Sequence, residues 1–514
     1  MDDSTITYVV LGAAVVLFVV DKVPVAVVAV LVALSLWASG VLSLEDALAG
    51  FGDPTVLFIA SLFVVSEALE ASGVTAWVGQ QLVARVGGSR TRLIVMTMGL
   101  AAGLTALLNV NGAVAALVPV AVVLAVQTGR SPSQLMLPLA FAAHAGSLLA
   151  LTGTPVNVIV SDAVPGGDGF GFFSFALVGV PLVLGTVAIV LVFGERLLPA
   201  RTPRSIAPDF SGHARTLIAQ YELDHPEEAL LNRRSGVAEV VIPPRSALAG
   251  DRVFPGMVTE SGDLVVLAVQ RRGEDVGAVA LTEGDTLLLQ GTWAALDRGL
   301  DEVLVVDEPE LVRRAMPLGA GAKRALVVMA AMVLLLATGA VPPAAAGLLA
   351  ASALLVLRVL TVEQAQRGVS WTTVVLVGGM MSLSTAMVAT GAAAQLADVL
   401  VDVVGDAGPY ALLLGLFVLT AVLGQLISNM ATALIVIPVA LSAAADMDVA
   451  AEPVLMAVTV SAAAAFLTPV ATPANLMVME PGGYRFGDYW KLGLPLLVWF
   501  GLVAVLLVPV FWSF

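Results

Sequence analysis

Threonine, proline and asparagine stand together at two places inside otherwise apolar sequence, as TPVN at residues 154–157 and as TPAN at residues 472–475. Proline lacks the backbone N–H of other residues, so each motif is expected to break a helix and to free backbone carbonyl and amide groups. Freed carbonyls and half-helix C-termini can coordinate Na⁺, whereas half-helix N-termini favour anions. A proline kink with local hydrogen bonds is the alternative, and the recurrence of the motif favours a ligand site.

A second pair of polar stretches, NVNG at residues 109–112 and SNMAT at residues 428–432, interrupts apolar sequence in the same way. Each is expected at the tip of a re-entrant helical hairpin, over residues 92–128 and 409–445. Amides and hydroxyls at these tips can donate to an anion, and their oxygens can ligate a sodium ion. Hydrogen bonding between helices is the alternative. The pairing with the proline motifs favours ligand binding.

These motifs give the candidate site. Substrate binding is assigned to Asn109, Asn111, Ser428, Asn429 and Thr432. Binding of Na⁺ is assigned to Asn109, Thr154, Asn157, Ser428, Thr472 and Asn475. His144 and Glu67 lie within apolar spans and are candidates for a proton relay, because ionisable groups inside a membrane are often functional; for His144 a neutral, hydrogen-bonded histidine is the alternative.

The composition points to a membrane protein. Of the 514 residues, 59% are hydrophobic and 12% are charged, about half the charged fraction of a soluble protein. Uncharged stretches such as residues 24–40 and 492–512 match the thickness of a bilayer. The net charge of −15 argues against nucleic acid as a partner. With no cysteine, three histidines and no nucleophile–base set, neither an enzyme nor a metal site other than one for Na⁺ is expected.

The chain divides into a first membrane half at 1–200, a polar segment at 201–322 and a second membrane half at 323–514. The halves repeat each other. The second TPxN motif lies 318 positions after the first, Gly391 lies 318 positions after Gly73, and Pro438 lies 319 positions after Pro119. Internal repeats of this kind are typical of secondary transporters.

Each half is expected to cross the membrane five times in addition to its hairpin, and the odd number makes the repeats inverted. The expected crossings of the first half are 5–20, 23–40, 54–85, a broken one at 134–161, and 174–196. Those of the second half are 324–340, 343–360, 371–397, a broken one at 453–479, and 492–512.

The distribution of Lys and Arg sets the orientation. With the N- and C-termini outside, every basic residue of the two halves falls on the cytoplasmic side, and the outer loops carry acidic residues only. The protein is therefore expected in the cytoplasmic (inner) membrane as a multi-pass protein, with residues 198–322 in the cytoplasm.

The polar segment is predicted to form a small α+β module with a core at about 236–308. Strands are expected at 236–244, 263–272, 285–291 and 302–308, with a short helix at 292–300 and a polar linker or irregular helix at 205–235.

The stretches SNMATALIVIPVA (428–440) and FLTPVATPANLMVMEPGGYRFGDYWKLGLPL (466–496) closely resemble the second half of the divalent anion:sodium symporter (DASS) family of the ion transporter superfamily. Members of that family carry a Ser-Asn-Thr signature at each hairpin tip and a broken helix opposite. Met430 stands where the second signature has threonine, and Asn109, Val110 and Asn111 replace the first. The first half thus also resembles arsenite or citrate permeases of the superfamily.

Within the polar segment, AEVVIPPRSALAGDRV (238–253) and EGDTLLLQG (283–291) resemble the RCK-C (TrkA-C) regulatory domain of potassium-transport proteins. That resemblance implies an inserted regulatory domain with an unidentified ligand. The family resemblance implies a homodimer in the lipid bilayer, with an elevator-type movement of each transport domain.

The expected function is secondary active transport, with Na⁺ as the coupling ion and a small divalent anion, sulfate or a dicarboxylate, as substrate. No intramembrane arginine is available to bind an oxyanion, which favours cation coupling. The alternative is a proton-coupled oxyanion permease or a cation exchanger of the same superfamily. A membrane sensor that transports nothing is a further alternative, and the paired helix breaks argue against it.

Overall fold

The computed structural model describes residues 2–75, 77–78, 81, 89–166, 169–201, 235–292, 296, 304–305 and 321–514, apart from residues 21, 129, 244–245, 247, 249, 255–256, 260–263, 272–273 and 405–406. The chain forms two units, one of residues 1–68, 82–207 and 327–514 and one of residues 69–81 and 208–326. The linker expected at 205–235 and the helix expected at 292–300 lie almost entirely outside the described residues.

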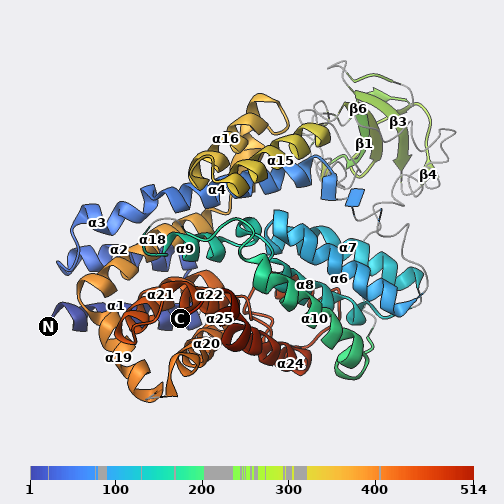
Figure 1. The fold of residues 1–514 in the computed structure, drawn as a ribbon. Coiled ribbons are helices and arrows are strands. Elements are labelled where there is room, and N and C mark those ends of the chain that lie inside the picture. The colour runs from blue at the N-terminus through green and yellow to red at the C-terminus, as the bar shows by residue number, and fades with distance from the viewer. Residues whose placement is uncertain are drawn as a thin grey trace. The chain divides into compact units, whose positions relative to one another are not determined.

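The described helices of the first half (Figure 1), apart from α3 and α4, end within two residues of the boundaries predicted from the sequence. Helix α4 ends at Ala71, whereas the crossing was expected to continue to residue 85, and residues 82–88 lie outside the described residues. They are α1 (Asp3–Val20), α2 (Val25–Ala38), α3 (Leu44–Ala49), α4 (Pro54–Ala71), α6 (Arg90–Leu107), α7 (Val110–Gln127), α8 (Met136–Gly146), α9 (Pro155–Asp162) and α10 (Ala176–Leu197). Helices α6 and α7 form the first hairpin, and α8 and α9 are the two parts of the broken segment.

The second half follows the same order. Its helices are α15 (Ala322–Thr338), α16 (Pro343–Val356), α17 (Val362–Gly368), α18 (Trp371–Ala389), α19 (Ala392–Val404), α20 (Pro409–Leu426), α21 (Asn429–Asp446), α22 (Ala451–Ala462), α23 (Pro473–Met477), α24 (Tyr489–Leu502) and α25 (Val508–Phe511). A π-helical turn, Val503–Leu507, joins α24 to α25.

Seven helices or helix pairs in the described part of the chain are long and apolar enough to cross a membrane. The segment expected as one crossing at 371–397 is divided into α18 and α19 at Gly391, whose φ of 74° is a left-handed conformation that ends helices. The short helices α3 and α17 were not predicted. Each begins with a side-chain cap: the hydroxyl of Ser43 accepts from the amide of Asp46, and that of Thr361 accepts from the amide of Gln364. A Ser or Thr three residues before an acidic or amide residue is a known signal for the start of a helix.

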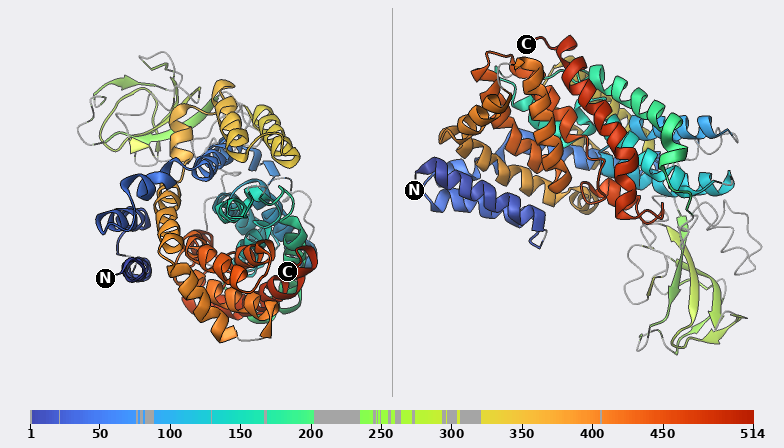
Figure 2. Two further views of the ribbon diagram at one scale, coloured as in Figure 1. Left: turned by 60° about the vertical axis from the view of Figure 1, so that its left-hand side comes forward. Right: turned by 90° about the horizontal axis from the view of Figure 1, so that it is seen from below.

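Close helix packing brings distant parts of the chain together. Helix α18 packs along α2, where Gly379 approaches the backbone of Ala29 and leaves no room for a side chain. Helices α21–α24 contact α8–α10, and both views of Figure 2 show the orange-to-red C-terminal helices beside the green ones of the first half. The two broken segments therefore meet inside one helical bundle.

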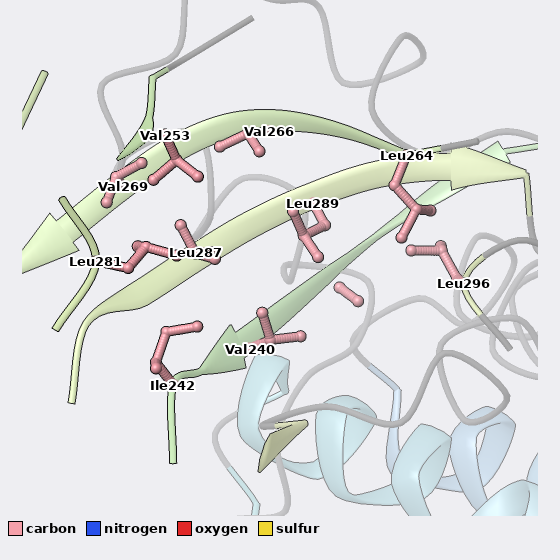
Figure 3. Close-up of a cluster of buried hydrophobic side chains, with 11 residues drawn as sticks. Val240, Ile242, Val253, Leu264, Val266, Val269, Leu281, Leu287, Leu289 and Leu296 are labelled. Carbon is pink, nitrogen blue, oxygen red and sulfur yellow. The ribbon is translucent and has the colours of Figure 1, made fainter. Parts of the chain in front are cut away.

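The second unit contains an antiparallel sheet with strand order β4-β3-β6-β1-β7. Its strands are β1 (Ser235–Val241), β3 (Leu264–Arg271), β4 (Glu274–Asp275), β6 (Thr286–Thr292) and β7 (Leu304–Val305), and a separate pair is formed by β2 (Arg252–Val253) and β5 (Val279–Ala280). Four of these strands lie where the sequence predicted them. Aliphatic side chains such as Val240, Val266 and Leu289 form the core (Figure 3).

One ion pair is built into this sheet. Both carboxylate oxygens of Asp285, which is buried, accept hydrogen bonds from the Arg271 guanidinium, at 2.8 and 2.7 Å. Oδ2 of Asp285 also accepts from the amide of Thr282 at 2.8 Å. These bonds hold the turn before β6 against the end of β3, and the Arg271 guanidinium lowers the pKa of Asp285.

Candidate functional site

The first TPxN motif opens a helix break whose carbonyls are bound by its own asparagine. Thr154 is extended and caps α9, accepting a hydrogen bond from the amide of Val156 at 3.4 Å. Asn157 is fully buried, and its Nδ2 donates to the carbonyl oxygens of Ser147 at 2.8 Å and Ala150 at 2.9 Å. Those carbonyls lie just beyond the end of α8, so Asn157 ties the two parts of the broken segment together.

The second TPxN motif has the same arrangement. Thr472 caps α23 by accepting from the amide of Asn475 at 3.3 Å. Nδ2 of Asn475 donates to the carbonyl oxygens of Ala465 at 2.7 Å and Thr468 at 3.1 Å. In both motifs the acceptors lie ten and seven residues before the asparagine. The matching bonds mean that the two breaks are built by the same local interactions.

Each hairpin tip begins its second helix with a side-chain cap. Oδ1 of Asn109 accepts from the amide of Gly112 at 2.8 Å, and Oγ of Ser428 accepts from the amide of Ala431 at 3.3 Å. The remaining amides at the start of α7 and α21 have no intrahelical acceptor, and these N-termini carry partial positive charge. Both tips therefore provide a favourable environment for an anion.

Each hairpin contacts the break of its own half. Thr152 donates to the carbonyl of Ala106 at 2.9 Å, near the end of α6. In the second half, Oε1 of Gln425 accepts from the amide of Leu467 at 2.9 Å, and its Nε2 donates to the carbonyl of Ala464 at 3.2 Å. Hydrogen bonds thus fix both hairpins to their breaks close to the tips.

A cavity of about 20 Å³ lies between α4, the first tip and the first break, which is enough for one water molecule. Nδ2 of Asn109 lies 3.4 Å from Oγ of Ser66 on α4. The cavity is lined by Ile59, Leu62, Phe63, Leu107, Leu108, Asn109, Thr152 and Pro155.

His144 reaches from the first half into the second break. It is buried on α8, and its Nε2 lies 3.1 Å from Oγ1 of Thr472 and 3.3 Å from Oδ1 of Asn475. Its ring also packs edge-on against Phe466, with the centroids 6.0 Å apart. The structure therefore brings this candidate residue into contact with the second TPxN motif.

Several buried polar atoms near the breaks and tips have no hydrogen-bond partner among the described residues. Such atoms are rare in folded proteins, and each can accept or donate a further hydrogen bond or ligate an ion. In these segments they are Asn157 Oδ1, Asn429 Oδ1, Thr432 Oγ1 and Thr468 Oγ1.

Two glycines let α10 and α24 approach the breaks closely. A Cβ at Gly179 of α10 would overlap the carbonyl oxygen of Leu148, and a Cβ at Gly493 of α24 would overlap that of Phe466. Leu148 and Phe466 are 318 positions apart, the same interval that separates the TPxN motifs. The same close contact thus supports both breaks.

A polar network links the second break to the end of the first half. The hydroxyl of Tyr489 donates to the carbonyl of Asn475 at 2.6 Å. The preceding residue, Asp488, accepts from the Arg201 guanidinium at 2.6 Å. Oγ of Ser133, before α8, accepts from the amide of Arg201 at 2.9 Å. Residue 201 therefore contacts both halves where the chain leaves the first one.

A larger cavity of about 690 Å³ lies elsewhere in the helical unit, where the start of α4, α9 and the α15–α16 loop come together. Its volume is in the range of small-molecule sites. Its lining includes Thr55, Phe58, Val158, Ser161, Asp162, Phe170, Ala337 and Pro342.

Two of the predicted site residues, Asn111 and Glu67, differ in their exposure to solvent. Asn111 is exposed on the first turn of α7, and Glu67 is buried on α4 with its side chain against Gly368 at the end of α17. Thr468 was not among the predicted site residues although its carbonyl and hydroxyl both lie in the second break. Gln425 was also not assigned, and its position just before the tip was the available signal.

The citrate transporter family, CitMHS, matches residues 15–460 and 411–514 of the chain. The "uncharacterized transporter YfbS" of Escherichia coli (strain K12) is 30% identical over 98% of this chain and 98% of its own length. The "sodium/sulfate cotransporter 1" of Chlamydomonas reinhardtii is 25% identical over 56% of this chain and 34% of its own length. The crystal structure of the YdaH transporter of Alcanivorax borkumensis has a similar fold, with a TM-score of 0.50, 13% identity, and coverage of 90% of this chain and 87% of that one.

The chain thus combines apolar helices around two broken segments with similarity to a transporter over almost its full length. The divalent anion:sodium symporter assignment stays a prediction, because the family that matches is a different one. The chain is a multi-pass membrane transporter and belongs to the CitMHS citrate transporter family.

Proposed function

We propose that this transporter is a secondary symporter that couples the uptake of a small divalent anion, sulfate or a dicarboxylate, to Na⁺. Substrate and cation bind between the hairpin tips and the breaks. The observation that carries the proposal is the group of four buried polar atoms in these segments that have no partner among the residues that the structure describes. The name of the Chlamydomonas sodium/sulfate cotransporter supports the choice of ions.

The candidate residues supply neutral donors and acceptors. The hydroxyls of Thr432 and Thr468 and the tip amides can donate to an anion. Side-chain oxygens and freed carbonyls in the two breaks can ligate Na⁺. The cation candidates remain Asn109, Thr154, Asn157, Ser428, Thr472 and Asn475, and the substrate candidates remain Asn109, Asn111, Ser428, Asn429 and Thr432. A bound cation compensates the charge of the anion, because no arginine lies in these segments.

The two halves are proposed to be inverted repeats that move as an elevator within a homodimer. The matched bonds of Asn157 and Asn475, and the matched contacts of Gly179 and Gly493, support the repeat. The N- and C-termini are placed outside the inner membrane and residues 198–322 in the cytoplasm. The sheet of the second unit is proposed to be an RCK-C-like domain that binds a regulatory ligand.

Proton coupling, as in an oxyanion permease or exchanger of the superfamily, is the second candidate. It is favoured by His144, a buried ionisable residue that contacts the second break. For Glu67, which faces Gly368, a role as relay rests on its burial alone.

Uptake of labelled sulfate and succinate into proteoliposomes tests the proposal, with an inward Na⁺ gradient and separately an inward H⁺ gradient. We expect Na⁺-driven uptake of one anion that is lost in Asn429→Ala and Asn475→Ala. The matched control is Thr385→Ala, which removes an exposed hydroxyl that donates to the carbonyl of Met381 within α18. Uptake driven by the H⁺ gradient alone would favour the second candidate, and no movement of either anion under Na⁺ would overturn the sodium symport of these substrates.

A further inference from the structure

The two TPxN asparagines make the same bonds through nitrogen but differ at oxygen. Both side chains are fully buried. Oδ1 of Asn475 lies 3.3 Å from Nε2 of His144, whereas Oδ1 of Asn157 has no partner among the described residues. A neutral imidazole protonated at Nε2 donates to the first of these oxygens. A buried carbonyl oxygen without a donor is costly, and a bound cation would satisfy the oxygen of Asn157.

The repeat explains the difference. The residue 318 positions after His144 is Ala462, the last residue of α22. Helix α22 packs against α9, which carries Asn157, as α8 packs against α23, which carries Asn475. The position beside Asn475 that the imidazole of His144 fills thus corresponds, beside Asn157, to the methyl group of Ala462.

The place beside Asn157 suits a monovalent cation. Its amide oxygen is a neutral ligand of the kind that Na⁺ accepts, and the C-terminal end of α8 carries partial negative charge. The carbonyls of Ser147 and Ala150 lie in the same break and accept from Nδ2 of the same side chain. The cation is therefore proposed on the Oδ1 side of Asn157, close to backbone that the break leaves outside a helix.

Two further unpartnered atoms of the breaks and tips are hydroxyls that suit the anion instead. They belong to Thr432 and Thr468 of the second half, which can donate, and Thr432 lies in the first turns of α21 near its positive N-terminus. The corresponding residues of the first half, 319 and 318 positions earlier, are Ala113 and Ala150. Oδ1 of Asn429, at the same tip as Thr432, is an acceptor without a partner among the described residues.

We propose that the protein binds one coupling cation per protomer, at the first break with Asn157 Oδ1 as a ligand. At the second break, the side chain of His144 fills the corresponding place beside Asn475. The inference rests on the proposed sodium coupling and sets its stoichiometry. Two similar breaks would by themselves suggest two equal cation sites, and the structure makes them unequal.

Equilibrium binding of ²²Na⁺ to the purified full-length protein tests this without any transport measurement. We expect one Na⁺ per protomer in the wild type and two in His144→Ala, which opens the second place. Ala462→His fills the first place and is expected to abolish binding. The double variant His144→Ala with Ala462→His exchanges the two arrangements and is expected to restore one Na⁺. Each variant is checked for a monodisperse elution profile and for its thermal midpoint.

The wild-type stoichiometry decides even if a variant does not fold. Two Na⁺ per protomer together with Na⁺-driven uptake would overturn the single-cation inference and leave the symporter proposal standing. No Na⁺ binding together with H⁺-driven uptake would overturn both. A His144→Ala protein that folds and still binds one Na⁺ would show that His144 does not close the second site.

Discussion

At the scale of single residues, the polar side chains of the two TPxN motifs stabilise backbone that the helix breaks leave unpaired. Asn157 and Asn475 each satisfy two carbonyls, and Thr154 and Thr472 each cap the helix that follows. Their sequence pattern predicted the breaks. It did not predict which oxygen stays free, because that depends on His144, a residue of the other half.

The ion pair between Arg271 and Asp285 gives the sheet a pH dependence. The Arg271 guanidinium lowers the pKa of Asp285, so the carboxylate contributes stability that is complete above its unfolded value of about 3.9 and is lost as the pH falls through the lower folded value. We expect Asp285→Asn to destabilise the second unit at pH 7 by roughly 1–3 kcal/mol, with the difference from wild type shrinking in acid.

Limited proteolysis of the full-length protein at a series of pH values measures this. The matched control is Asp251→Asn, because the side chain of Asp251 is exposed. Equal digestion rates for wild type and Asp285→Asn at pH 7 would contradict the prediction.

At the scale of elements, helix positions were largely predictable and helix contacts were not. Apolar length located α1, α10 and α15, and the polar stretches located both hairpins. The close contact of Gly179 with Leu148 has no sequence signal of its own, because a glycine within an apolar helix is common in membranes. The division between α18 and α19 was missed because apolar sequence continues across Gly391.

Close backbone contact at the breaks leads to a prediction for α10 and α24. Gly179→Ala and Gly493→Ala each place a methyl group against a break carbonyl and are expected to lower stability by about 1–3 kcal/mol and to reduce uptake. Gly103→Ala is the control, since no atom lies within 4 Å of its added Cβ. Thermal unfolding in detergent and uptake by proteoliposomes report the two effects. Wild-type behaviour of both test variants would show that the helices can separate at no cost.

At the scale of the whole molecule, composition and repeat spacing predicted a transporter with two related halves, and the family match agrees with a transporter. The substrate could not be deduced, because neutral amides and hydroxyls bind many anions. The polar network at Arg201 could not be predicted from the sequence either, because its partner Asp488 lies 287 positions away.

That network is expected to hold the two halves together. Arg201→Gln removes the nearer of two cations beside the nearly buried Asp488 carboxylate, the other being Lys491 at 3.8 Å, and should lower the thermal midpoint of the full-length protein, at a cost of roughly 1–3 kcal/mol. The double variant Arg201→Gln with Asp488→Asn should recover part of the loss, because the buried charge is removed together with its nearer partner. If the midpoint of the double variant is lowered by the sum of the reductions in the two single variants, the pair is not directly coupled.

The cavity of about 690 Å³ offers a direct view of movement in the helical unit. Val158, the neighbour of Asn157 in sequence, lines it together with residues of α4 and of the α15–α16 loop. The chain has no cysteine, so Val158→Cys introduces a single thiol at the wall of this space. A maleimide probe would then modify one defined position, and its reaction rate with and without Na⁺ would report how far α9 shifts against α4 as the ion binds.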